Sequence, residues 1–310
     1  MKIRQYLLAL VSLFFLAACG QASQEKDENQ GLTIVTSFYP IYAITQEVAG
    51  DENTVQMIQS GQGIHGFEPS ANDMRAINDA DVFVYHSKHL ESWAGNMGKN
   101  LADSQVKVIE GSKDLDLKRT QGLEDVETSE GIDEAQLADV HTWTDPIVAG
   151  QEAMTIAEQL AEIDPENADL YRENAKQFQV EAQSLVDKYK DDFDQLDQKN
   201  FVTQHTAFAY LADRFGLQQI GIAGADNTSE PSAQTLSEIE DFVSDYNVQT
   251  IYTEENVSPK YAQVVSDATG AEMDTLSPLE ADPENDKTYL ENLEANIKVL
   301  YDNMAKENQN

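Results

Sequence analysis

The sequence contains a single cysteine, Cys19, and far fewer basic than acidic residues. One thiol excludes a framework of disulfide bonds and any zinc site built from several cysteines. The 20 Lys and Arg residues stand against 56 Asp and Glu residues, which gives a formal net charge of −36. This excess of acid argues against binding to nucleic acid, which requires a basic surface. It also disfavours anionic membrane surfaces and favours the attraction of cations.

Long apolar runs are also scarce. The one candidate, residues 6–17, is shorter than the roughly 20 residues of a membrane-spanning helix, and it follows Lys2 and Arg4. This arrangement is typical of a secretory signal peptide. The run leads into Leu16-Ala17-Ala18-Cys19, which resembles the lipobox of bacterial lipoproteins, where the cysteine becomes the acylated first residue. The alternative is an ordinary signal peptide with a cysteine placed there by chance.

We therefore expect a lipoprotein signal peptide over residues 1–18 and acylation, for example with palmitate, at Cys19. Residues 19–31 are polar and end in glycine, so we expect a disordered tether there. No second apolar run approaches membrane length, and we expect the chain beyond the tether to be soluble. Removing Lys2 and Arg4 with the signal peptide would bring the net charge to −38.

Short β-branched runs alternate with helical patterns in two separate stretches of the chain. In the first, the expected strands are 32–36, 54–58, 81–85 and 106–109, and the expected helices are 41–49, 70–78 and 90–101. In the second, the expected strands are 201–204, 217–222, 248–252 and 272–276, and the expected helices are 207–214, 232–246, 259–269 and 286–304. Such alternation predicts two similar α/β domains with parallel sheets, over residues 32–163 and 198–310.

A long helical pattern over residues 164–197 separates these domains. Apolar residues recur at steps of three and four from Tyr171 to Leu196, which gives one continuous apolar stripe. Asp164 and Pro165 suit a capping residue and a first helical position. One helix of this length would span about 50 Å, so we predict a rigid strut that joins the domains. The alternatives are a helix that belongs to one domain and a coiled-coil arm.

Residues 111–140 differ from the rest of the first domain. They contain few large apolar groups and many acids. A stretch of this length without apolar periodicity does not form a packed element, and long loops of this kind are usually functional or disordered segments. We therefore expect residues 111–140 to form a mobile surface loop.

Five histidines are present, and three of them stand beside strand ends or turns. His65 follows the second expected strand, His141 precedes a helix, and His205 follows strand 201–204 directly. Ligands of open α/β sheets bind outside the carboxyl ends of the strands. The sequence holds no local metal motif, so one site would have to gather these distant residues. The alternative is three unrelated surface or hydrogen-bonded histidines.

The remaining histidines, His86 and His89, form a possible accessory pair. The simpler interpretation places both on the surface, at a turn from strand to helix.

A glycine pattern offers a competing function. Gly61-x-Gly63-x-x-Gly66 matches the dinucleotide fingerprint, and Asp81 follows at a plausible distance. The third glycine of that fingerprint belongs in a helix, but Pro69 follows almost at once. The fingerprint also normally follows the first strand of the fold, whereas this pattern follows the second. We therefore reject nucleotide binding.

At this point the motifs resemble a known family, the metal-specific solute-binding proteins of zinc and manganese ABC importers. The resemblance runs from residue 32 to residue 305, and the nearest branch is that of the streptococcal zinc-binding lipoproteins also called laminin-binding proteins. The motifs are His65-Gly-Phe-Glu-Pro-Ser70, His141-Thr-Trp-Thr-Asp-Pro146, His205-Thr-Ala-Phe-Ala-Tyr-Leu-Ala212, Glu230-Pro-Ser232, Tyr252-Thr-Glu-Glu-Asn-Val-Ser-Pro259 and Leu276-Ser-Pro-Leu-Glu280.

The resemblance implies one Zn²⁺ ion in a cleft between two α/β domains joined by a rigid helix. It implies that His65 and His141 come from the first domain and His205 and Glu280 from the second. It also implies a monomer that passes the ion to an ABC permease and its ATPase, on the outer face of a Gram-positive cell membrane. Many zinc-binding members carry a histidine-rich loop before the second ligand, whereas this region is acidic here.

Donor chemistry favours zinc independently, because three neutral imidazoles and one carboxylate oxygen fill a tetrahedron, whereas manganese prefers more oxygen donors. Glu254 and Glu255 should lie near the site without binding the ion. A zinc hydrolase is the alternative among enzymes, but a catalytic zinc keeps one position open for water. An adhesin for host laminin is the alternative among binding proteins, and it is compatible with transport.

Overall fold

The computed structural model describes residues 31–58, 63–95, 97, 104–120, 137–224, 230–255 and 257–308. The chain from Leu32 onward forms one compact unit. Within the described residues, no helix combines the length and the apolar character needed to cross a membrane. The predicted signal peptide, the acylation of Cys19 and nearly all of the predicted tether lie outside the described residues.

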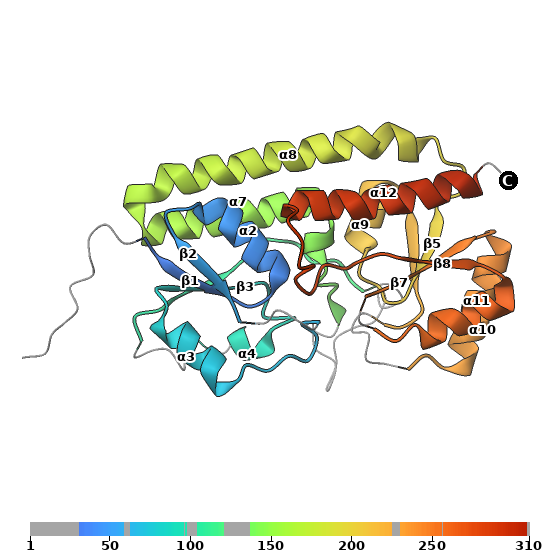
Figure 1. Cartoon of the computed structure of the whole chain (residues 1–310), viewed down its shortest axis with the longest axis horizontal. Helices are drawn as coiled ribbons and strands as arrows, with labels where there is room; N and C mark the ends of the chain where they lie inside the picture. The colour runs from blue at the N-terminus through green and yellow to red at the C-terminus, as the bar shows by residue number, and fades with distance from the viewer. Residues whose placement is uncertain are drawn as a thin grey trace, which may run out of the picture. The chain divides into compact units, whose positions relative to one another are not determined.

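Two four-stranded sheets, with the helices that connect their strands, form two lobes (Figure 1). Every strand pair is parallel, and the spatial orders are β2-β1-β3-β4 and β6-β5-β7-β8. The strands of the N-terminal lobe are β1 (Thr33–Thr36), β2 (Thr54–Met57), β3 (Val82–Tyr85) and β4 (Lys107–Glu110). Those of the C-terminal lobe are β5 (Asn200–Thr203), β6 (Gln218–Gly221), β7 (Thr250–Thr253) and β8 (Glu272–Thr275).

The helices of the N-terminal lobe are α2 (Tyr39–Ala49), α3 (Ala71–Asp79), α4 (Ser92–Gly95) and α7 (Pro146–Ile163), with a 3₁₀ turn η1 (Thr142–Thr144). A second 3₁₀ turn, η2 (Pro165–Asn167), precedes the long helix α8 (Ala168–Asp194). The C-terminal lobe contains α9 (Ala209–Arg214), α10 (Ala233–Asp245), α11 (Lys260–Thr269) and α12 (Tyr289–Glu307). The predicted class, two α/β domains with parallel sheets and a long connecting helix, is confirmed.

Both faces of each sheet are covered, and successive side chains of the central strands pack into different cores. In β1, Ile34 packs with the buried residues of α2, α7 and α8, whereas Val35 packs on the opposite face with Ile77 of α3. In β5, Phe201 joins the first of these cores and Val202 packs against α10 and α11. Successive side chains of a strand point to opposite faces, so a strand covered on both sides reads as a continuous apolar run.

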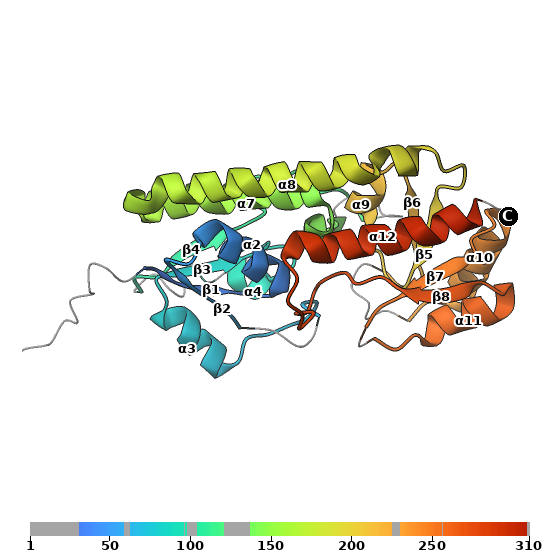
Figure 2. The same cartoon turned by 45° about the horizontal axis from the view of Figure 1, so that its top comes forward.

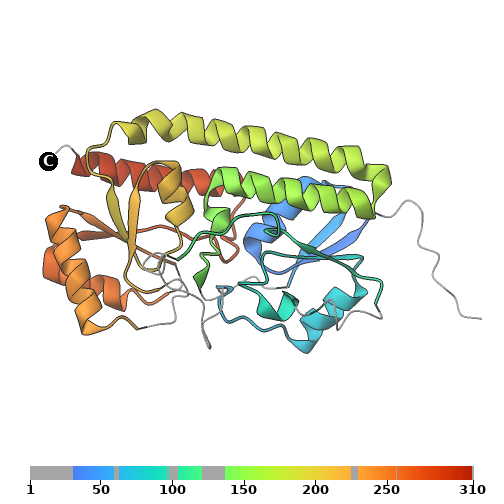
Figure 3. The ribbon, with the colours of Figure 1, turned by 180° about the vertical axis from the view of Figure 1, so that it is seen from behind.

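The long helix α8 lies alongside α7 in all three views and alongside α12 (Figures 1, 2 and 3). Its apolar stripe, which includes Tyr171 and Phe178, enters one continuous core that also contains residues of both lobes. The start of this segment differs from the prediction, because Pro165–Asn167 form a 3₁₀ turn. The Asp164 side chain caps no backbone N–H there and instead accepts hydrogen bonds from Tyr171 Oη (2.6 Å) and Asn167 Nδ2 (2.8 Å).

Two other predictions need correction. The helix expected over 90–101 is the short α4, and residues 98–103 lie outside the described part. The prediction of a surface loop over 111–140 is wrong at the two ends of this range, and residues 121–136 lie outside the described part. Arg119 pairs with Ala138 in an antiparallel bridge, and Asp139 is buried. Backbone hydrogen bonds from Thr120 N to Leu137 O and from Asp139 N to Lys118 O, both 2.8 Å, hold these ends together just before His141.

Candidate metal centre

Four side chains from distant parts of the sequence converge in the described structure: His65, His141, His205 and Glu280. One donor atom from each lies within 4.8 Å of the others. Glu280 Oε1 stands 3.4 Å from His65 Nε2, 3.7 Å from His141 Nε2 and 3.3 Å from His205 Nε2. The Nε2 atoms of His65 and His141 are 3.1 Å apart. The structure thus brings together all four predicted ligands.

Parallel topology explains this convergence. His65 follows β2, His205 follows β5 and Glu280 follows β8, so three of the four side chains leave the carboxyl ends of strands. His141 precedes η1 and α7. In each sheet the carboxyl ends of the parallel strands lie at one edge, where open α/β folds bind their ligands, and here the edges of both sheets contribute to one cluster.

The cluster has the unpaired donors that a metal ion would satisfy. His205 Nε2 and Glu280 Oε1 are both buried without a hydrogen-bond partner among the described residues. Buried polar atoms are nearly always paired, and an orphan calls for an ion or another ligand. Three imidazole nitrogens and one carboxylate oxygen match the four-coordinate donor sets of zinc. The residues therefore fit a zinc ion in both number and chemistry.

Two carboxylates contact the Nδ1 atoms of His141 and His205 and so orient these two rings. Asp139 Oδ1 lies 2.8 Å from His141 Nδ1 and also accepts a hydrogen bond from the His141 backbone N–H. Glu254 Oε1 lies 2.5 Å from His205 Nδ1. A carboxylate on the second ring nitrogen fixes the tautomer and raises the basicity of a ligating histidine. Glu254 thus lies beside the cluster, as expected, whereas Glu255 is exposed.

Burial and these carboxylates shift the protonation of the metal-free cluster. Burial lowers the pKa of His205, but the nearby carboxylates of Glu254 and Glu280 outweigh that effect and raise the pKa to about 10. Burial lowers the pKa of His141 likewise, and Asp139 and Glu280 raise it by more. Burial raises the pKa of Glu280, but His141, His205 and His65 together hold it well below its usual value. Without an ion, these shifts favour charged imidazoles on His141 and His205 beside a charged Glu280.

The segment that carries His141 is bound to the C-terminal lobe as well as to its own. Trp143 Nε1 donates to Pro278 O (2.8 Å), two residues before Glu280, and Tyr289 Oη donates to Trp143 O (2.6 Å). Tyr210 Oη donates to Asp139 O (2.8 Å). These bonds explain how one histidine of the N-terminal lobe is held in register with the ligands of the other lobe. Sequence reasoning had no signal for them beyond the position of Trp143 in its motif.

His86 corrects the prediction of a surface residue. Its side chain is fully buried, because Nε2 lies 2.8 Å from Val140 O and Nδ1 lies 3.6 Å from Glu152 Oε2. Its place at a turn from strand to helix suggested exposure to solvent, whereas Glu152 of α7 packs against it. His89 is partly buried, and neither histidine belongs to the metal cluster.

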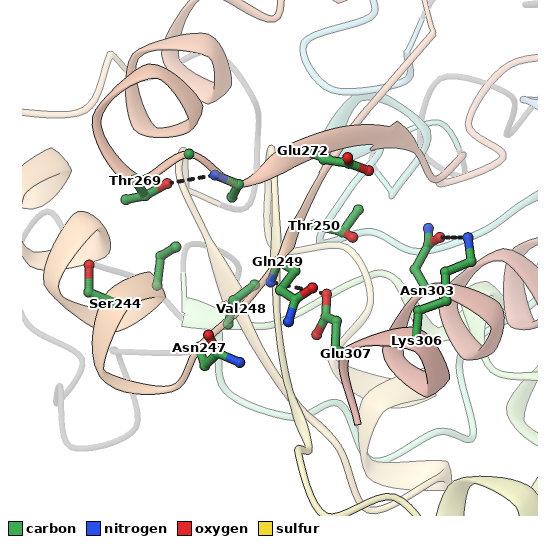
Figure 4. A pocket seen from close by; sticks show the side chains of 13 residues that line it. Ser244, Asn247, Val248, Gln249, Thr250, Thr269, Glu272, Asn303, Lys306 and Glu307 are labelled. Atoms are coloured by element: carbon green, nitrogen blue, oxygen red, sulfur yellow. Dashed lines mark hydrogen bonds between the residues drawn. The ribbon is translucent and has the colours of Figure 1, made fainter. Parts of the chain in front are cut away.

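A polar cavity of about 490 Å³ lies elsewhere in the C-terminal lobe (Figure 4). Gln249, Thr250 and Glu272 line it at the amino ends of β7 and β8. The carboxylate of Glu307 also faces this cavity and accepts a hydrogen bond from the backbone N–H of Gln249 (3.1 Å). Because Glu254 and Glu280 follow the carboxyl ends of these strands, the cavity is separate from the metal cluster.

The family model described as zinc-uptake complex component A, periplasmic, matches residues 34–303. The chain belongs to this family. It is 34% identical over 308 residues to the high-affinity zinc uptake system protein ZnuA of Bacillus subtilis (strain 168), a match that covers 96% of this chain and 97% of that protein. It is 36% identical over 306 residues to the zinc-binding lipoprotein AdcA of Streptococcus pneumoniae (strain ATCC BAA-255 / R6). That match covers 97% of this chain but only 60% of AdcA.

Solved structures agree with this assignment. A Zn(II)-bound mutant variant of AdcAII from Streptococcus pneumoniae superposes with a TM-score of 0.84 at 55% identity, covering 89% of this chain and 99% of that chain. The laminin-binding protein Lmb of Streptococcus agalactiae, described as bifunctional with adhesin and metal-transporting activity, gives 0.82 at 53% identity, covering 89% and 100%. The resemblance to streptococcal zinc-binding and laminin-binding lipoproteins is confirmed.

Proposed function

We propose that this protein is an extracellular zinc receptor, which captures Zn²⁺ through His65, His141, His205 and Glu280 and passes it to an ABC permease. The observation that carries the proposal is the convergence of three imidazoles and one carboxylate within 4.8 Å, with two donor atoms unpaired and buried. Membership of a zinc-uptake family and likeness to a Zn(II)-bound structure support it.

The number of protein donors favours capture of zinc over catalysis. Four protein ligands fill the tetrahedron of zinc, whereas a catalytic site leaves one position for water. Zinc is therefore the cargo of a receptor rather than the cofactor of an enzyme. His65 has the most exposed ligand side chain, at 13%, whereas His141 and His205 are fully buried. The ion therefore has its most direct contact with solvent beside His65.

The cellular setting is part of the same proposal. The lipobox-like sequence at Cys19 supports acylation and anchoring on the outer face of a Gram-positive membrane. The likeness to the zinc-binding lipoprotein AdcA supports it as well. We further propose that the receptor works as a monomer, with a permease driven by its own ATPase.

Metal content tests the central claim. Protein purified without added metal is analysed for bound ions and then titrated with zinc and manganese in competition with a chelator. We expect one zinc per chain and a large preference for zinc over manganese. The Glu280→Ala and His141→Ala variants should lose tight binding. Tight zinc binding that survives both substitutions would place the site elsewhere.

Laminin binding is the second candidate, and the likeness to the laminin-binding adhesin Lmb favours it. An adhesin needs an exposed surface, whereas the metal cluster is largely buried. Binding of immobilised laminin by a His141→Ala variant that no longer holds zinc would separate the two roles. Absence of laminin binding in the zinc-loaded unsubstituted protein would exclude the second role.

A further inference from the structure

Gly63, two residues before His65, lies against the carboxylate of Glu280. A β-carbon added to its backbone would stand 2.7 Å from Glu280 Oε2, closer than real side chains approach. The φ angle of Gly63 lies outside the left-handed region, so the backbone conformation itself would accept another residue. Gly66 differs, because its φ angle of 73° favours glycine. Within the glycine pattern first compared with a dinucleotide fingerprint, Gly66 turns the chain and Gly63 makes room for a carboxylate.

This contact bears on how Glu280 presents its two oxygens. Oε1 lies 3.3–3.7 Å from the Nε2 atoms of the three histidines, whereas Oε2 is the oxygen next to Gly63. One oxygen added to three imidazoles makes four donors, the number that zinc takes in closed sites. Two oxygens would make five donors and suit an ion that prefers a larger, oxygen-rich shell, such as manganese.

We propose that Gly63 is a specificity-determining residue, whose bare backbone keeps Glu280 in the orientation that gives one oxygen to the ion. The inference rests on the proposed function, because it assumes that the cluster binds zinc. A methyl group at position 63 occupies the space next to Oε2, so we expect the carboxylate to rotate. Rotation presents both oxygens to the ion and raises the coordination number, which weakens zinc binding relative to manganese binding.

The direct test is Gly63→Ala, titrated with zinc and with manganese in competition with a chelator. Disturbance of groups that orient metal ligands typically costs about 10–100-fold in affinity. We expect a loss of zinc affinity of that order and a narrower preference for zinc over manganese. Co²⁺ serves as a spectroscopic probe, and its visible absorption should weaken if the coordination number rises above four. Gly224→Ala is the matched control, because its β-carbon meets no described atom within 4 Å.

A double-mutant cycle shows whether the effect passes through Glu280. Glu280→Asp shortens the side chain by one methylene group and withdraws its carboxylate from position 63. Gly63→Ala should therefore cost much less zinc affinity in the Glu280→Asp background than in the unsubstituted protein. Equal losses in the two backgrounds would overturn the inference, as would an unchanged affinity and Co²⁺ spectrum in Gly63→Ala. Failure of the proposed function is distinguishable, because it appears as weak zinc binding in the unsubstituted protein.

Discussion

Zinc binding should expel protons well above the pH at which free imidazole titrates. With a pKa of about 10, roughly one metal-free molecule in a thousand carries neutral His205 at pH 7. Zinc requires the neutral ring, so the apparent affinity should rise about tenfold per pH unit for each displaced proton. The raised pKa of His141 acts in the same direction. Glu280 contributes no proton there, because its pKa is lowered well below 4.5.

Two measurements check this linkage. Competition titrations at pH 6.5, 7.5 and 8.5 give the slope, and calorimetry in buffers of different ionisation enthalpy gives the number of protons released. We expect at least one proton per zinc at pH 7.5. Glu254→Gln is the control, because the amide oxygen still accepts from His205 Nδ1 but carries no charge. This variant should release fewer protons near pH 8. An affinity that stays flat between pH 6.5 and 8.5 would refute the reasoning.

Three further predictions concern the ligands and the anchor. Zinc at a thousandfold excess over Kd should stabilise the fold by about 4 kcal/mol and so raise its Tm. His141→Ala should lose most of this rise in Tm, and equal Tm shifts in both proteins would contradict the site. His205→Glu should narrow the preference for zinc over manganese in competition titrations, because a second negative charge then stands beside Glu280; an unchanged zinc constant would exclude His205 as a ligand. Cys19→Ala should release the protein into the culture medium, and retention on cells would contradict the lipoprotein prediction.

The fold was largely predictable from the sequence because its signals are local. The strands are short β-branched runs such as Thr33–Thr36, and the stripe of α8 repeats at steps of three and four. Errors arose where tertiary contacts decide the outcome. Asp164 was expected to cap a helix, but Tyr171 supplies its hydrogen bond instead. His86 follows a strand and looked exposed, but α7 buries it.

The metal centre was predictable only in part from the residues themselves. Strand ends and turns identified His65, His141 and His205 as candidates, but spacing alone left open whether they share a site. Glu280 lies 75 residues beyond His205 in a chain with 56 acidic residues, so only the family motif singled it out. The fit of Gly63 against Glu280 could not be foreseen, because it joins two loops that no local pattern connects.

The buried pair His86–Glu152 supports the His141 segment and carries the last prediction. His86 Nδ1 lies 3.6 Å from Glu152 Oε2, and both side chains are fully buried. Glu152 also accepts a hydrogen bond from Thr142, and His86 Nε2 contacts Val140 O, so the pair holds the residues on both sides of His141. Burial lowers the pKa of His86, but Glu152 and Glu91 raise it by more, which favours the charged imidazole. The pair therefore joins β3, α7 and the ligand segment through one interior contact.

Removing one member should cost far more than removing both. Glu152→Leu leaves the buried imidazole without its partner, and such a loss typically destabilises a protein by about 3–5 kcal/mol. The double variant His86→Leu, Glu152→Leu buries no charge and should be clearly more stable than the sum of the two single losses predicts. Denaturant unfolding of the metal-free proteins measures both costs. Glu158 lies on α7, as Glu152 does, and Glu158→Leu breaks only an exposed pair with Arg172 of α8, so it should change stability little. Strictly additive single losses would show that His86 and Glu152 do not act as a pair.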